Sequence, residues 1–182
     1  MARATRAARA AAARKAARKP AAPAPPVDET ALGVGGLLCW GALAILALAG
    51  MGVAAYLTYT HYADEVVACG PLGRCETVQQ SEYSTIAGVP VALLGGLAAA
   101  ALLAIALGRL SGLPLAVEWA SLAALGLTTA SVAFAAYLTY IELFVLDAIC
   151  IYCLALASIF AASWLISLAD SFLTRDISPE PG

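Results

Sequence analysis

The sequence predicts an all-α integral membrane protein, a bundle of four transmembrane helices with both the N-terminus and the C-terminus in the cytoplasm. Of its 182 residues, 62% are hydrophobic and only 12% are charged, whereas soluble domains are about 45–50% apolar. Uncharged runs of about 20 residues are typical of transmembrane helices, and the chain contains four of them. The basic residues lie almost entirely on one side of these runs, which predicts the orientation.

The four predicted spans cover residues 32–59, 89–107, 119–141 and 149–168. Nine of the ten Lys and Arg residues precede the first span, lie between the second and third, or follow the fourth, and only Arg74 lies on the other side. Because Lys and Arg mark the cytoplasmic side, the loops 61–88 and 142–148 are expected to face outward. A transporter or channel would place ionisable groups inside its spans, and the predicted spans contain none.

The chain is expected to have three parts. Residues 1–30 are rich in Ala, Arg, Lys and Pro and predict a disordered basic cytoplasmic tail, residues 31–170 a four-helix membrane domain, and residues 171–182 a cytoplasmic C-terminal tail. A transit peptide stays an alternative for residues 1–27, which are Arg-rich and acid-poor but nearly free of serine. The lipid bilayer is the expected partner of the basic tail, and no nucleic-acid partner is expected.

Four of the five cysteines form two pairs on the outward side. Cys69 and Cys75 form C-x5-C in a turn-rich loop, and Cys150 and Cys153 form C-x-x-C at the start of the fourth span. The outer side of a bacterial inner membrane is oxidising, so two thiol pairs on that side predict a relay of disulfide exchange. Two alternatives stay open, a tetrathiolate metal site and a pair of permanent disulfides. The resting pairing of the thiols is also left open.

The surroundings of both pairs favour thiolates. Asp147 is expected to cap the fourth helix and to place Cys150 in its first turn, where the helix dipole favours a thiolate. Cys153 then lies on the same face, one turn deeper in the membrane. The charge of Arg74 favours a thiolate at the neighbouring Cys75.

A relay needs a terminal electron acceptor, and in a bilayer a quinone is the diffusible acceptor of two electrons. Its pocket needs apolar walls and a few polar groups. The candidates are Gln79, Gln80, Ser81, Tyr83 and Ser84, where the loop re-enters the membrane, with Tyr137, Tyr140 and Tyr152 at outer helix ends. The alternatives are a helix-capping role for the serines and an interfacial role for the tyrosines.

A hexapeptide, Ala-Ala-Tyr-Leu-Thr-Tyr, occurs at residues 54–59 and again at residues 135–140. Each copy ends an outward-running span and precedes a cysteine pair. This placement suggests two hairpins in parallel repeat, each carrying one thiol pair. Chance in an alanine-rich sequence is the alternative.

Four motifs in order carry a family resemblance: C-x5-C in the first outer loop, Q-Q-S-x-Y after it, I-A-G-V-P-V-A-L-L-G opening the second span, and C-x-x-C opening the last. Together they resemble the bacterial vitamin K epoxide reductase family, over about residues 33–168. The resemblance implies a membrane enzyme that reoxidises a periplasmic thioredoxin-like oxidase of the DsbA type. It also implies a quinone of the ubiquinone, menaquinone or phylloquinone type as electron acceptor.

The resemblance also implies roles for five residues. Cys153 matches the cysteine that reacts with quinone, and Cys150 matches its disulfide partner. Cys69 matches the loop cysteine that takes electrons from the partner protein, and Cys75 matches the shuttle that attacks Cys150. Ser81 matches a serine near the quinone head.

The predicted function is therefore that of a thiol–quinone oxidoreductase in the bacterial inner membrane, with its active site on the outer face, that supports disulfide formation. Many relatives carry a fused thioredoxin-like domain, whereas this sequence ends at Gly182, so the partner is expected in trans. Two alternatives remain: a quinone reductase of the DsbB type on a different fold, and a non-catalytic membrane protein stapled by disulfides.

Overall fold

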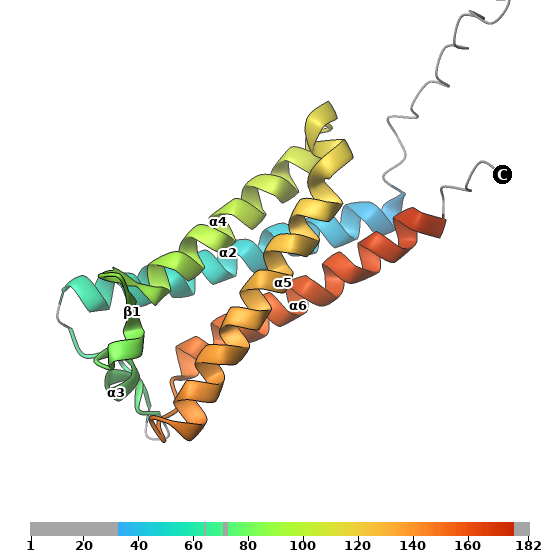
Figure 1. Cartoon of the computed structure of the whole chain (residues 1–182). Helices are drawn as coiled ribbons and strands as arrows, with labels where there is room; N and C mark the ends of the chain where they lie inside the picture. Colours follow the sequence, from blue (N-terminus) through green and yellow to red (C-terminus); the bar gives the residue numbers. More distant parts are fainter. Residues whose placement is uncertain (1–32, 64, 71–72, 177–182) are drawn as a thin grey trace, which may run out of the picture. The chain divides into compact units, whose positions relative to one another are not determined.

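The computed structural model describes residues 33–63, 65–70 and 73–176. Within them, four helices are long and apolar enough to cross a membrane: α2 (Val34–Tyr62), α4 (Val91–Leu110), α5 (Pro114–Phe144) and α6 (Ile151–Asp176). They run back and forth as a bundle (Figure 1). The predicted four-helix membrane architecture is confirmed. The predicted N-terminal tail lies outside the described residues, and so does the chain from residue 177 onward.

Two helix boundaries differ from the prediction in ways that matter for the chemistry. α5 continues to Phe144, so Glu142 lies in its last turn and not in an outward loop. α6 begins at Ile151, while Asp147 takes a left-handed backbone conformation, with φ of +46°, in the turn before it. The prediction that Asp147 caps α6 is therefore wrong. At its other end α6 runs to Asp176, six residues into the segment predicted as a tail.

The helices pack closely because small residues line their contacts. α2 packs against α4 and α6, and α5 packs against α6 and α4. One buried cluster holds the bundle together in the half away from the cysteine pairs. Five of its eight members are alanines, Ala44, Ala47, Ala106, Ala120 and Ala124, which pack with Trp40, Leu43 and Leu102. Small side chains let helix backbones approach in a membrane, where dispersion forces drive helix association.

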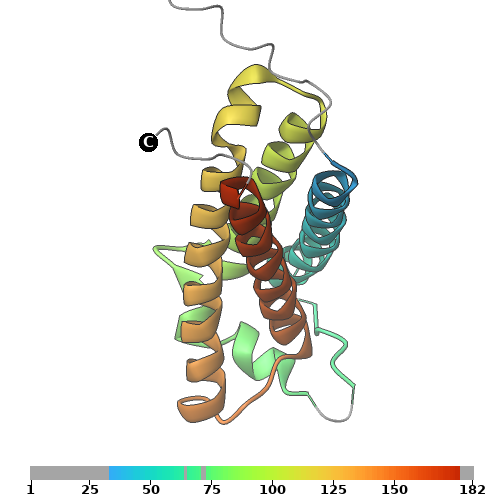
Figure 2. The same cartoon turned by 90° about the vertical axis from the view of Figure 1, so that its right-hand side faces the viewer.

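The connection from α2 to α4 folds back over one end of the bundle. It contains α3 (Cys75–Gln79), the short 3₁₀ helix η1 (Glu82–Ser84), and the strands β1 (Thr85–Ile86) and β2 (Val89–Pro90). The strands pair antiparallel, and Ala87 and Gly88 between them both have positive φ, as a type I′ hairpin turn requires. In both views this connection lies beside the turn from α5 to α6 (Figure 1, Figure 2). We call this end, residues 65–90 and 145–150, the cysteine end.

Candidate active site

The loop pair forms a disulfide. Cys69 and Cys75 are bonded, with their Cα atoms 5.8 Å apart, within the usual range for a disulfide. Cys75 is the first residue of α3 and is 0% exposed, whereas Cys69 is half-buried. Gly73 lies against this bond, because a Cβ atom at residue 73 would come within 2.5 Å of Cys69 Sγ. Glycine is therefore the residue that lets the loop close around its disulfide.

The second pair is free and opens α6. Cys150 directly precedes the helix and is 0% exposed, while Cys153 lies in the first turn. The backbone N–H of Cys153 donates to Cys150 Sγ over 3.4 Å, so the sulfur of Cys150 takes the capping position expected for Asp147. A hydrogen bond with the Cys153 side chain lowers the pKa of the Cys150 thiol. The helix start thus favours the thiolate of Cys150.

The two pairs meet through their buried members. Cys75 and Cys150 belong to one buried cluster with Leu57 and Val67. A backbone hydrogen bond joins the residues that precede the two cysteines, because the N–H of Arg74 donates to the carbonyl of Ile149 over 3.0 Å. The structure therefore brings together cysteines that are far apart in the sequence. The remaining cysteine, Cys39, is a free thiol near the start of α2.

Two tyrosines hold the loop just before Cys69. The backbone N–H of Ala68 donates to the Tyr56 hydroxyl over 3.3 Å, and the Tyr152 hydroxyl donates to the Ala68 carbonyl over 3.0 Å. The two rings lie 5.1 Å apart. Tyr152, which the sequence suggested for a quinone pocket, thus contacts the loop.

An apolar cavity of about 390 Å³ lies between α4, α5 and α6, next to Cys153. Its walls come mainly from aliphatic and aromatic side chains such as Leu127, Phe134 and Phe160. Most polar residues of its lining gather near the cysteine end: Gln79, Ser81, Tyr83, Ser84, Thr139 and Glu142. Ser131, in the middle of α5, is the exception. Four of the residues that the sequence suggested for this pocket, Gln79, Ser81, Tyr83 and Ser84, are therefore in the lining.

The other suggested residues, Gln80, Tyr137, Tyr140 and Tyr152, lie outside that lining. Tyr137 is 55% exposed and packs beside Phe134, and Tyr152 faces the loop. The serines make local hydrogen bonds: Ser81 Oγ donates to the Val78 carbonyl over 2.7 Å, and Ser84 Oγ donates to the Ser81 carbonyl over 2.8 Å. Each hydroxyl would have to rotate in order to donate to a ligand.

Glu142 is the site residue that the sequence reasoning missed. Its side chain is 3% exposed, lines the cavity together with Cys153, and accepts the Cys150 backbone N–H at Oε2 over 3.2 Å. The third predicted span ends at residue 141, directly before this charged residue. An ionisable residue at the end of an apolar run, eight residues before a cysteine, was the available signal.

The cavity fits a lipid-soluble quinone. Its volume lies within the usual range for ligand pockets, about 300–1,000 Å³, and such pockets combine apolar walls with a few placed polar groups. The apolar walls suit a ring with a hydrocarbon tail, and the polar groups near the cysteine end suit the ring oxygens. Cys153 would be the redox-active sulfur facing the ring, because it belongs to the lining.

A comparison with known families agrees with this geometry. The model described as "Vitamin K epoxide reductase family" matches residues 41–168 of the chain. The match covers both cysteine pairs and every residue that lines the cavity.

Proposed function

This chain belongs to the vitamin K epoxide reductase family, as its motifs indicated, and from that premise we propose that it is a membrane thiol–quinone oxidoreductase that oxidises a thioredoxin-like protein. One observation carries the proposal. Cys75 and Cys150, the buried members of the two pairs, share one cluster, while Cys153 opens on an apolar cavity. Electrons that enter at Cys69 can therefore pass from sulfur to sulfur as far as Cys153 at the cavity.

The relay consists of thiol–disulfide exchanges. A thiolate of the reduced partner attacks Cys69, and Cys75 leaves as a thiolate. Cys75 then attacks Cys150 in a Cys150–Cys153 disulfide, and Cys153 leaves as a thiolate. Attack of the second partner thiolate releases Cys69 and oxidises the partner, and Cys69 then attacks Cys75, which restores the loop disulfide and frees Cys150. Each exchange breaks one S–S bond and forms another.

The reduced Cys150–Cys153 pair must then lose two electrons. A bound quinone supplies an acceptor for two electrons and two protons. The apolar walls of the cavity would hold its ring and tail, and Ser81 and Ser84 would contact its oxygens. With the disulfide restored, Cys150 is ready for the next attack by Cys75.

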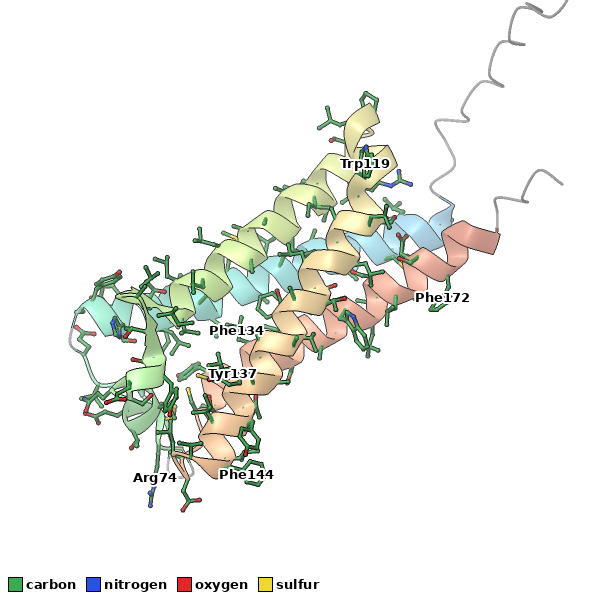
Figure 3. All side chains as sticks on the ribbon, viewed as in Figure 1. Arg74, Trp119, Phe134, Tyr137, Phe144 and Phe172 are labelled. Carbon is green, nitrogen blue, oxygen red and sulfur yellow. A yellow bond between two sulfur atoms is a disulfide. The ribbon has the colours of Figure 1, made fainter. Side chains whose placement is uncertain are left out.

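We place the cysteine end on the outer face of a bacterial inner membrane, with residues 1–30 and the C-terminal residues on the cytoplasmic side. Nine of the ten Lys and Arg residues support this orientation. The exception, Arg74, points away from the bundle at the cysteine end (Figure 3). In this orientation the reaction produces disulfide bonds outside the cytoplasm.

The test is steady-state turnover. Purified protein with a reduced thioredoxin-like protein should consume quinone, followed by the loss of quinone absorbance. Cys153→Ala should abolish turnover, and Cys39→Ala, which changes the thiol far from both pairs, should leave it unchanged. Full activity of Cys153→Ala would overturn the relay. Resistance of Cys69–Cys75 to mild reductant, shown by the absence of alkylation, would instead identify a static disulfide.

A further inference from the structure

Glu142 is a carboxyl group in an environment that carboxyl groups rarely occupy. It lies in the last turn of α5, is 3% exposed, and forms part of the wall of an apolar cavity. An ionisable side chain is costly to place there unless it is hydrogen-bonded, and in membrane proteins such residues mark ion and proton pathways. Its position therefore calls for a role beyond helix packing.

The contacts of Glu142 join the thiols to the cavity. Its Oε2 accepts the backbone N–H of Cys150 over 3.2 Å, and its side chain lines the same cavity as that of Cys153. Cys153 in turn donates its backbone N–H to Cys150 Sγ over 3.4 Å. Cys150, Cys153 and Glu142 thus form a row of proton-bearing groups that ends at the cavity.

The chemistry of the pair requires proton movement. Oxidation of the Cys150 and Cys153 thiols breaks two S–H bonds, forms one S–S bond, and releases two electrons and two protons. Reduction of a quinone to a quinol consumes two electrons and two protons. The thiols that release these protons lie on one side of Glu142, and the cavity in which the quinone would consume them lies on the other.

We propose that Glu142 carries both protons from the thiols to the cavity. Its carboxylate takes the proton of Cys153, leaving a thiolate, and gives that proton to an oxygen of the acceptor. The proton of Cys150 then follows along the same row while the S–S bond forms. Glu142 ends as the carboxylate with which it began. This inference rests on the proposed function, which supplies the acceptor.

A purely structural role is the competing explanation, because Glu142 also ties the start of α6 to the end of α5. Glu142→Gln separates the two roles, since the amide oxygen can still accept the Cys150 N–H but the group cannot carry a proton. Glu142→Asp keeps the acid on a shorter side chain. Glu82→Gln is the matched control, because Glu82 is an exposed carboxyl group on η1.

The first measurement needs no quinone. An infrared difference spectrum between protein with an oxidised and with a reduced Cys150–Cys153 pair should contain a carboxylate band, because the Glu142 carboxylate loses the neighbouring Cys153 S–H group when the S–S bond forms. Glu142→Gln should lose that band, Glu142→Asp should shift it, and Glu82→Gln should retain it. Retention of an unshifted band in both Glu142 variants would overturn the proposal.

The second measurement is turnover. Glu142→Gln should lower kcat with quinone about 100-fold with little change in KM, within the usual range for loss of a general acid–base group, and Glu142→Asp should recover part of that loss. Exchange of the partner with Cys69–Cys75 should stay within twofold of wild type in both variants. A wild-type kcat for Glu142→Gln would overturn the proposal. If the wild-type protein itself fails to reduce quinone, the proposed function fails, and the infrared spectrum still decides whether Glu142 responds to the redox state of the two thiols.

Discussion

The loop pair, Cys69 and Cys75, and the helix pair, Cys150 and Cys153, each bury one sulfur in the same cluster. In the loop pair Cys69 is half-buried and Cys75 is 0% exposed, and in the helix pair Cys150 is 0% exposed while Cys153 reaches the cavity. Each pair therefore has one accessible sulfur and one buried sulfur, and the buried sulfurs lie together. In the proposed relay the accessible sulfurs face different partners, a protein at Cys69 and the membrane cavity at Cys153.

This difference teaches how one site can serve two unlike reactants. A thiolate reacts only with a disulfide that it can reach. Burial of Cys75 and Cys150 thus favours exchange between the pairs over exchange with stray thiols. The arrangement makes the two members of each pair unequal, and substitutions should show that inequality.

The largest effect is expected from the members of the loop pair. Cys75→Ser removes the loop sulfur from the buried cluster and should lower turnover about 1,000-fold or more with any reductant, as loss of an essential nucleophile does. Cys69→Ser should be equally damaging with the protein partner. With a small dithiol, which can reach the remaining sulfurs, Cys69→Ser should cost less than about tenfold, because exchange depends on access.

The measurement is quinone consumption with each reductant in parallel. Cys39→Ala provides the control for loss of a thiol elsewhere in the chain. Equal losses for Cys69→Ser with the protein and with the small dithiol would break the comparison, since the two sulfurs of the loop would then have one and the same role.

The membrane bundle was predictable because its signal is spread over whole segments. Four apolar runs identify four helices even though individual boundaries shift. The spacing of the cysteines predicted two pairs, and the structure bonds Cys69 to Cys75. The family followed from motifs in order. These features depend on composition and spacing, which a sequence displays directly.

The details of the pocket depend on which way side chains face, which spacing alone does not decide. Tyr152 is next to Cys153 in sequence, but neighbours on a helix point about 100° apart, and the tyrosine faces the loop while the cysteine faces the cavity. Glu142 was missed because its charge was read as the end of a span. Asp147 was misplaced because the turn before α6 gives it a positive φ.

The next largest effect should come from filling the cavity beside Cys153. Ala157 lies one turn after Cys153 on α6 and lines the cavity, so Ala157→Phe should exclude quinone. We expect KM for quinone to rise about tenfold, equivalent to about 1.4 kcal/mol. Exchange between the partner and the loop disulfide should not change, which would sharpen the distinction between the two accessible ends.

Ala155→Phe is the matched control, because Ala155 is exposed on the same helix. The substitution adds the same side chain at a place away from the cavity. Its KM for quinone should stay near the wild-type value. An unchanged KM for Ala157→Phe would show that quinone binds somewhere other than this cavity.

An effect of about the same size is expected at Gly73, the glycine beside the loop disulfide. In Gly73→Ala the new Cβ atom would come within 2.5 Å of Cys69 Sγ, so the disulfide or the loop must shift. The oxidised loop should lose about 1.4 kcal/mol, a tenfold change in its thiol–disulfide equilibrium. Equilibration with glutathione measures this change. Gly70→Ala, where a Cβ atom meets nothing within 4 Å, should not alter the equilibrium.

The smallest effect should come from the tyrosines that hold Ala68. Tyr56→Phe and Tyr152→Phe each remove one hydrogen bond to its backbone, which contributes about 0.5–1.5 kcal/mol to holding the loop. The loop should detach more often, and a small dithiol should reduce Cys69–Cys75 a few-fold faster in each variant. To measure that rate, the reduction is stopped at set times and the free thiols are alkylated and counted.

The repeated hexapeptide provides the control for this last comparison. Tyr137 occupies the position in the second copy that Tyr56 occupies in the first, but it is exposed beside Phe134. Tyr137→Phe should therefore leave the reduction rate of the loop disulfide unchanged. If all three variants accelerate reduction equally, the effect belongs to the helix ends in general and the loop is not held through Ala68. If only Tyr56→Phe and Tyr152→Phe accelerate it, identical sequences have acquired different roles because only one copy faces the cysteine loop.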